Sequence, residues 1–123
     1  MMDLRYHTHA VVLALRLEAR ARAGRSFIPT RLEGIGTLKL DARTGEMAVL
    51  ASRRAVARIC RLKSCLTRSI VLFHLLERQY PAKLVMGFRP GSDGPDGHAW
   101  VTVDGMPVGE MPGHLDGFVT IVS

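Results

Sequence analysis

A cysteine and a histidine occupy positions in this chain that suit nucleophilic catalysis. Cys65 lies in the stretch SCLTRS, residues 64–69, where a basic connection passes into an apolar run with helical spacing. A thiol in the first turn of a helix lies near unpaired N–H groups and the positive end of the helix dipole, which favour the thiolate. His98 follows in a strand-like stretch, with Trp100 on the same face, where it shields the imidazole or fills the core. Together, Cys65 and His98 predict a cysteine nucleophile with a histidine base.

Hairpin geometry predicts which acid completes a catalytic triad. Asp104 lies six residues after His98, about 20 Å along an extended strand, which is too far to orient the imidazole. If residues 103–105 form a three-residue loop, Glu110 lies opposite His98 on the same face. A two-residue Asp-Gly turn would instead place Met111 opposite His98 and turn Glu110 to the other face. We prefer the three-residue loop because it gives the histidine a partner, so Glu110 is the predicted acid.

The other cysteine and histidines are interpreted without a catalytic role. Cys60 ends a helical stretch and is interpreted as a structural thiol. His74 is interpreted as structural or exposed. His7 and His9 could chelate a metal, but further ligands are missing from the sequence around them, so no metal site is predicted. His114 follows Pro-Gly and could belong to a loop or line a cleft, and we prefer the loop.

Length and composition indicate one domain. The 123 residues are 47% hydrophobic, which is enough for one core and too little for two. Apolar runs are shorter than the roughly 18 to 20 residues of a membrane span, and residues 10–15, followed by Arg16, do not resemble a signal peptide. We therefore expect a cytoplasmic protein. Two cysteines five positions apart are expected to be free thiols.

The net charge of +6 is unevenly distributed. Residues 1–82 contain 15 Lys and Arg against 6 Asp and Glu, whereas residues 83–123 contain 2 against 5. A basic half could meet an acidic partner. Because the arginines fall on segments with apolar stripes and no nucleic-acid motif is recognisable, we expect solvated helix faces or a protein docking surface and no nucleic acid.

The expected architecture is α+β, with N-terminal helices followed by an antiparallel sheet. Helical spacing predicts helices over residues 8–23, 46–60 and 65–80, the last capped by Ser64 and stopped by Pro81. Alternation predicts strands over residues 82–88, 98–103, 106–111 and 118–122, with a loop over 89–96. Residues 1–45 are expected to form a helix and an irregular segment with a short strand near 35–40, and residues 46–123 the core of a single domain.

Three segments resemble one known family in order and spacing: CLTRSIVLFHLLER, LVMGFRP and GHAWVTVDGMPVGE. They are similar to the bacterial lasso-peptide leader peptidases, the stand-alone protease halves of the lasso precursor-processing machinery within the transglutaminase-like superfamily. The resemblance covers about residues 45–123 and implies a papain-like or transglutaminase-like core with a Cys/His/acid triad. It places Cys65 and His98 at the nucleophile and base positions. Where an aspartate is expected twelve residues after the histidine, this chain has Glu110.

The resemblance implies a cysteine peptidase that removes the leader from a ribosomally made precursor through a thioester, without a cofactor. It also implies a separate leader-binding protein and a separate ATP-dependent lasso cyclase. The N–H of Cys65, at a helix start, is a candidate oxyanion donor. Two alternatives remain open: an acyltransferase of the same superfamily, in which an amine resolves the thioester, and a non-catalytic basic adaptor.

Overall fold

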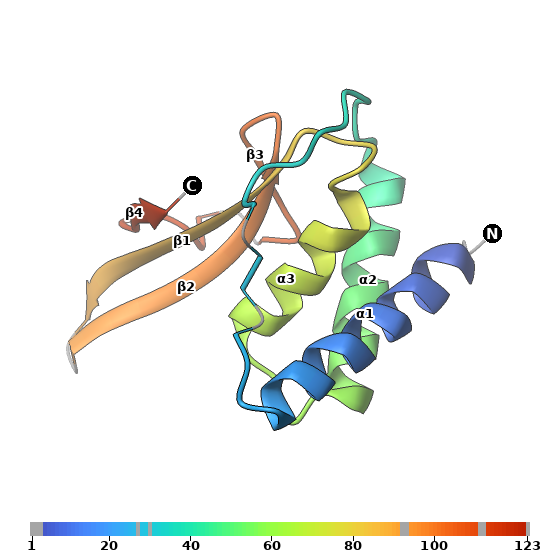
Figure 1. Ribbon diagram of the computed structural model, residues 1–123. Coiled ribbons are helices and arrows are strands. Elements are labelled where there is room, and N and C mark those ends of the chain that lie inside the picture. The colour runs from blue at the N-terminus through green and yellow to red at the C-terminus, as the bar shows by residue number, and fades with distance from the viewer. Residues whose placement is uncertain (1–3, 27, 30, 92–93, 111–112, 123) are drawn as a thin grey trace.

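Three helices pack together and a curved antiparallel sheet lies along one side of them (Figure 1). The computed structural model describes residues 4–26, 28–29, 31–91, 94–110 and 113–122. The helices come first and the four strands last, so the predicted α+β class is confirmed. Among the described residues, we find no helix with the length and apolar character needed to cross a bilayer.

The helices are α1 (Leu4–Arg22), α2 (Ala42–Ile59) and α3 (Cys65–Leu76). Side-chain caps set two of their starts. The carboxylate of Asp41 accepts the N–H of Thr44 at 2.7 Å, which moves the start of α2 upstream of the predicted residue 46. The hydroxyl of Ser64 accepts the N–H of Thr67 at 3.2 Å, so α3 begins with Cys65 in its first turn, as predicted.

The predicted strand over residues 35–40 is wrong. This segment is extended, but the N–H groups of Ile35 and Leu38 donate to the carbonyls of Glu77 and Gln79 just after α3. The carbonyls of Glu77 and Gln79 thus gain partners just beyond α3, which ends at Leu76 and not near residue 80. Gly36 is required at the crossing, because an added Cβ would lie 1.9 Å from the carbonyl carbon of Gln79.

The strands are β1 (Ala82–Gly91), β2 (Gly94–Val103), β3 (Met106–Val108) and β4 (Val119–Val122), in the order β3-β2-β1-β4 and antiparallel throughout. The predicted loop over residues 89–96 is wrong. Strands β1 and β2 stay paired as far as Gly91 and Gly94. An ion pair between Arg89 and Asp96, 2.9 Å apart, joins the two strands within this extension.

The predicted three-residue loop between β2 and β3 is also wrong. Val103 pairs with Met106, so the turn has two residues, Asp104 and Gly105. Both have positive φ, 52° and 77°, which is the backbone conformation of a type I′ hairpin turn and favours Asp-Gly. Strand β3 ends at Val108, and Met111, the residue that this register would place opposite His98, lies outside the described residues.

The hydrophobic core forms where α3 packs between the other helices and the sheet. The largest fully buried side chains include Phe73, Ile70 and Leu76 of α3 and Leu84 of β1. Truncation of a buried phenylalanine such as Phe73 to alanine typically lowers the free energy of unfolding by about 3 to 5 kcal/mol. The helix that carries Cys65 is therefore firmly held against the sheet that carries His98.

Candidate active site

Cys65 is the first residue of α3 and is half-buried. The first hydrogen bond of the helical ladder is donated by the N–H of Arg68 to the carbonyl of Ser64, at 3.1 Å. The N–H groups of Cys65 and Leu66 therefore precede the ladder and point out of the helix start. A group held beside the Cys65 sulfur could accept a hydrogen bond from this end of the helix.

His98 and Glu110 form a close pair. Nε2 of His98 lies 2.8 Å from Oε1 of Glu110, and the two side chains are only 15% and 13% exposed. Since the carboxylate accepts, Nε2 carries the proton and Nδ1 of the neutral ring has the free lone pair. This tautomer leaves Nδ1 as the atom that can take a proton from a thiol.

Glu110 reaches His98 by a different route from the one predicted. The two-residue turn would direct Glu110 to the other face of the hairpin if β3 continued. Instead the strand stops at Val108, and Gly109, with φ at 77°, turns the chain back toward β2. A Cβ at Gly109 would lie 2.8 Å from Cγ2 of Val49, so glycine is needed for both the turn and the packing.

Cys65, His98 and Glu110 line one pocket of about 240 Å³. The structure thus brings together the three residues predicted from the sequence. Ser69, one helical turn after Cys65, donates its hydroxyl to the carbonyl of Ala99 at 3.0 Å. This buried bond joins α3 to β2 beside the pocket, and Ser69 is not among the residues predicted from the sequence.

Aromatic rings surround the His98 imidazole. Trp100 stacks on it at a centroid distance of 5.7 Å and is buried, so it both covers the ring and fills the core. The ring of Phe118, the residue before β4, has its centroid 5.7 Å from that of His98, and the Arg89 guanidinium lies 4.5 Å from the Phe118 ring centroid. These contacts restrict the orientation of the imidazole.

His114 lies in a turn and also lines the pocket, so both readings of this residue hold. Its ring stacks on His98 at 5.0 Å, and its Nδ1 lies 3.6 Å from Oε2 of Glu110. Ligand atoms of His98, Glu110 and His114 all lie within 4.8 Å of one another. Two imidazoles and a carboxylate are ligands that zinc accepts, and a metal held here would compete with the His98–Glu110 pair for the same atoms.

The remaining candidates lie away from this pocket. Cys60 is 2% exposed, its thiol contacts the carbonyl of Ala14, and burial raises its pKa, which fits the predicted structural role. His74, in the last turn of α3, pairs with Glu77, the residue that follows the helix. His9 has its pKa lowered by burial and then by Arg78.

The chain matches the transglutaminase-like superfamily over residues 9–123. Because this match spans nearly the whole sequence, the chain belongs to that superfamily, which includes cysteine proteases and acyltransferases. Three helices followed by an antiparallel sheet agree with such a domain. Neither the curated proteins nor the solved structures give a significant match.

Proposed function

We propose that this chain is a cysteine peptidase that removes the leader from a ribosomally made lasso-peptide precursor. The observation that carries the proposal is the His98–Glu110 pair, 2.8 Å apart, in the same pocket as Cys65. Membership of a superfamily with cysteine proteases supports the reaction class. The similarity of three segments to leader peptidases supports the choice of substrate.

The proposed reaction begins when the Cys65 sulfur attacks the carbonyl carbon of the last leader residue. Nδ1 of His98 takes the thiol proton, and Glu110 stabilises the imidazolium through the Nε2–H bond. The N–H of Cys65 donates to the developing oxyanion. Collapse breaks the C–N bond, the proton passes from Nδ1 to the departing amine, and a thioester to the leader remains.

Water completes the cycle. Nδ1 of His98 takes a proton from water as its oxygen attacks the thioester carbon, and the C–S bond then breaks. The proton returns to the sulfur, and the leader leaves as a free carboxylate. These steps use the three side chains, the N–H of Cys65 and water, and the core peptide leaves with a free amine for a separate lasso cyclase.

The proposal includes a division of labour. A separate leader-binding protein captures the leader in the cytoplasm and presents its end to Cys65. Such tethering raises the effective concentration of the substrate, toward the millimolar range for short flexible linkers. Exposed arginines of α2, Arg54 and Arg58, offer a basic surface to that partner or to acidic leader residues.

An acyltransferase of the same superfamily is the second candidate, because the same pair and cysteine would also form a thioester. The two functions differ in what resolves it. An amine added at millimolar concentration would appear in the leader product of an acyltransferase, whereas a peptidase gives the free carboxylate. Mass spectrometry of the leader distinguishes the products.

The decisive experiment incubates the precursor and the leader-binding protein with the wild type, Cys65→Ala and His98→Ala. We expect cleavage only by the wild type, because the members of a triad act as a unit. Cys60→Ala, which removes the buried thiol, is the control and keeps activity. Intact precursor with the wild type, together with a Cys65 that iodoacetamide does not alkylate near neutral pH, would favour a non-catalytic adaptor.

A further inference from the structure

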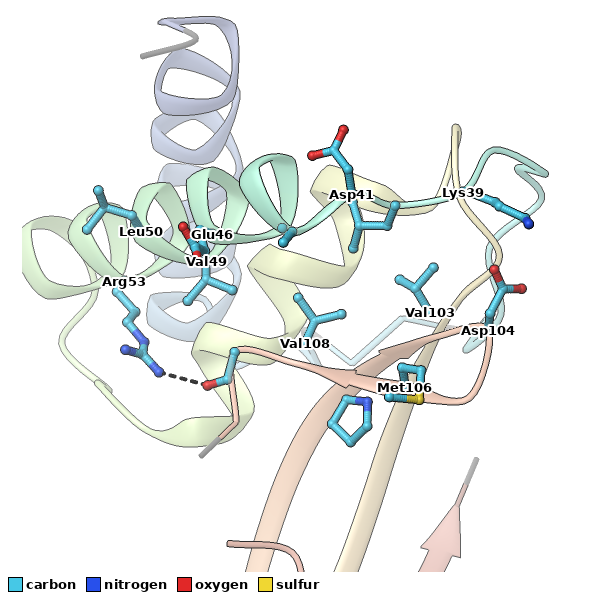
Figure 2. A pocket seen from close by; sticks show the side chains of 15 residues that line it. Lys39, Asp41, Glu46, Val49, Leu50, Arg53, Val103, Asp104, Met106 and Val108 are labelled. Atoms are coloured by element: carbon cyan, nitrogen blue, oxygen red, sulfur yellow. Dashed lines mark hydrogen bonds between the residues drawn. The ribbon is translucent and has the colours of Figure 1, made fainter. Parts of the chain in front are cut away.

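A second and larger cavity lies beside the catalytic pocket. It is a groove of about 720 Å³ between α2 and the β2–β3 hairpin, with α2 along one side and β3 along the other (Figure 2). Its apolar lining includes Val49 and Leu50 of α2 and Met106 of β3. Leu50 is 40% exposed and Met106 is 69% exposed, so large apolar side chains remain available for contact.

The groove adjoins the catalytic pocket. Four residues line both cavities: Val49, Arg53, Val108 and Gly109. Where the cavities meet, the Arg53 guanidinium donates to the carbonyl of Gly109 at 3.1 Å, the bond dashed in Figure 2. A peptide that leaves the Cys65 pocket in this direction therefore reaches the groove after it crosses this shared wall.

Strand β3 offers few main-chain hydrogen bonds to a bound peptide. This strand is at the edge of the sheet, and its pairs Val103–Met106 and Val101–Val108 flank Pro107. In a two-residue hairpin these flanking pairs direct their N–H and C=O groups toward β2, so the carbonyl of Pro107 points outward. Proline has no N–H. The edge thus offers an acceptor at Pro107 without a donor, which limits strand addition and leaves most of the binding to side chains.

The charges at the groove do not favour an acidic or a basic ligand. Two cations, Lys39 and Arg53, accompany three acids, Asp41, Glu46 and Asp104. Lys39 and Asp104 lie at the end away from Arg53 (Figure 2). The excess of basic residues in the first two-thirds of the chain is therefore not concentrated here, and the selective feature of the groove is its apolar wall.

We propose that this groove binds apolar side chains of the substrate peptide, roughly two to five residues from the scissile bond and on one side of it. Three residues of β3 extend about 10 Å, which matches about three residues of an extended peptide. Burying one leucine-sized side chain contributes about 1.5 to 3 kcal/mol, a preference of roughly tenfold or more. The inference rests on the proposed peptidase function and adds the sequence preference of its substrate.

The test is a cleavage profile on a library of peptides derived from a digested proteome. Micromolar enzyme and overnight incubation detect even slow cleavage without a partner protein, and mass spectrometry gives the residues around each cut bond. We expect enrichment of Leu, Ile, Val, Met or Phe at one or two positions within this range, on one side only. In the Met106→Glu and Leu50→Glu variants, we expect the enrichment of apolar residues to fall at least tenfold. Lys or Arg should be enriched at the same substrate positions instead.

The matched control is Leu15→Glu, which makes the same change at a similarly exposed leucine on α1, outside the groove. Its profile should equal that of the wild type. The alkylation rate of Cys65 by iodoacetamide should be unchanged in both groove variants, since this small reagent does not need the groove.

The outcomes separate the two proposals. Cleavage that requires Cys65 but shows no apolar preference, or a preference that both groove variants retain, overturns the groove as a substrate site. An absence of cleavage in the library overturns the groove as a determinant of substrate choice by this chain and leaves the peptidase function to the precursor experiment with the partner, whereas cleavage that persists in Cys65→Ala overturns the peptidase function itself and the groove inference with it.

Discussion

The hydroxyl of Ser69 donates a 3.0 Å hydrogen bond to the carbonyl of Ala99. Ser69 is one helical turn from Cys65, and Ala99 is the neighbour of His98 in β2. This buried bond therefore fixes the helix of the predicted nucleophile against the strand of the predicted base. Positioning of this kind matters because a misplacement of about 1 Å can cost on the order of 100-fold in rate.

We expect Ser69→Ala to lower kcat and the free energy of unfolding together. Loss of the donor leaves a buried carbonyl without its partner, at a cost of about 1 to 3 kcal/mol. Ser52→Ala is the matched control, because Ser52 is also buried and lines the same pocket, but bonds to Ala48 of its own helix. Denaturant unfolding and precursor cleavage measure both quantities. If kcat falls equally in the two variants, the link between α3 and β2 has no special role.

The predicted acid is tested by comparing Glu110→Gln with Asp104→Asn. The Gln variant loses the carboxylate that holds Nε2 of His98, and we expect kcat to fall on the order of 100-fold or more. The Asn variant should keep activity, because Asp104 is in the turn at φ 52° and asparagine tolerates that conformation. Initial rates of cleavage decide the matter, and an inactive Asp104→Asn with a normal Glu110→Gln would contradict the proposed triad.

His114 is expected to position His98 through its ring and less through its charge. Nδ1 of His114 lies 3.6 Å from Oε2 of Glu110, and the His114 side chain is 44% exposed. Exposed ion pairs of this kind contribute about 0.2 to 1 kcal/mol to stability. Ring stacking adds about 0.5 to 1.5 kcal/mol, equivalent to roughly 2- to 13-fold.

We therefore expect His114→Phe, which keeps a ring, to retain kcat, and His114→Asn, which keeps a polar donor, to lose activity by roughly that factor. Thermal unfolding should be similar in both, since the side chain is half exposed. The opposite order of kcat values would assign the role to the contact with Glu110.

Glu18 makes the stability of the fold depend on pH. The N–H of Arg61 donates to its carboxylate at 3.0 Å, and this bond first, then Arg22, lowers the pKa of Glu18 below its ordinary value of 4.5. A lowered folded-state pKa contributes stability above the unfolded value, and this contribution is lost as the pH falls through the folded-state pKa.

We expect Glu18→Gln to be less stable than the wild type at pH 7, and we expect the difference to shrink as the pH falls below the ordinary glutamate pKa of 4.5. Glu33→Gln is the control, because Glu33 is exposed and pairs with Lys83 at 3.6 Å. Denaturant unfolding at four or five pH values gives both curves. Parallel curves for Glu18→Gln and the wild type would remove Glu18 from the acid sensitivity of the fold.

The sequence predicts the classes of element well and some of the connections poorly. Ser64 and the apolar spacing after it correctly place Cys65 at a helix start, because capping is local. Residues 35–40 are misassigned as a strand because their partners are carbonyls at the end of α3, a contact distant in sequence.

The position of Glu110 shows the same limit within the site. The predicted register is wrong, yet Glu110 contacts His98 because Gly109 turns the chain. The packing of Gly109 against Val49 of α2, which leaves no room for a Cβ, is a contact distant in sequence that the local pattern does not encode. Ser69, four residues after Cys65, could have been identified from helical spacing alone, whereas the stacking of His114 on His98 required the structure.

The last prediction is that cleavage of the precursor is slow without the leader-binding protein and that basic residues of α2 contribute to docking. Arg54 and Arg58 are exposed and four residues apart, so they share one face of the helix. Arg53 is left unchanged, because its guanidinium holds the carbonyl of Gly109 beside the pocket. We expect Arg54→Glu with Arg58→Glu to slow cleavage in the presence of the partner, and more at low than at high salt, since exposed charges are screened beyond about 8 to 10 Å at physiological ionic strength.

The control is Arg16→Glu with Arg20→Glu, the same charge change at the same spacing on α1. Time courses at two salt concentrations, with and without the partner, separate docking from net charge. If both double variants slow cleavage equally, the effect follows net charge and the α2 surface is not the docking site. Equal rates with and without the partner would show that this chain recognises its substrate unaided, because tethering by a partner would then add nothing to the effective concentration at Cys65.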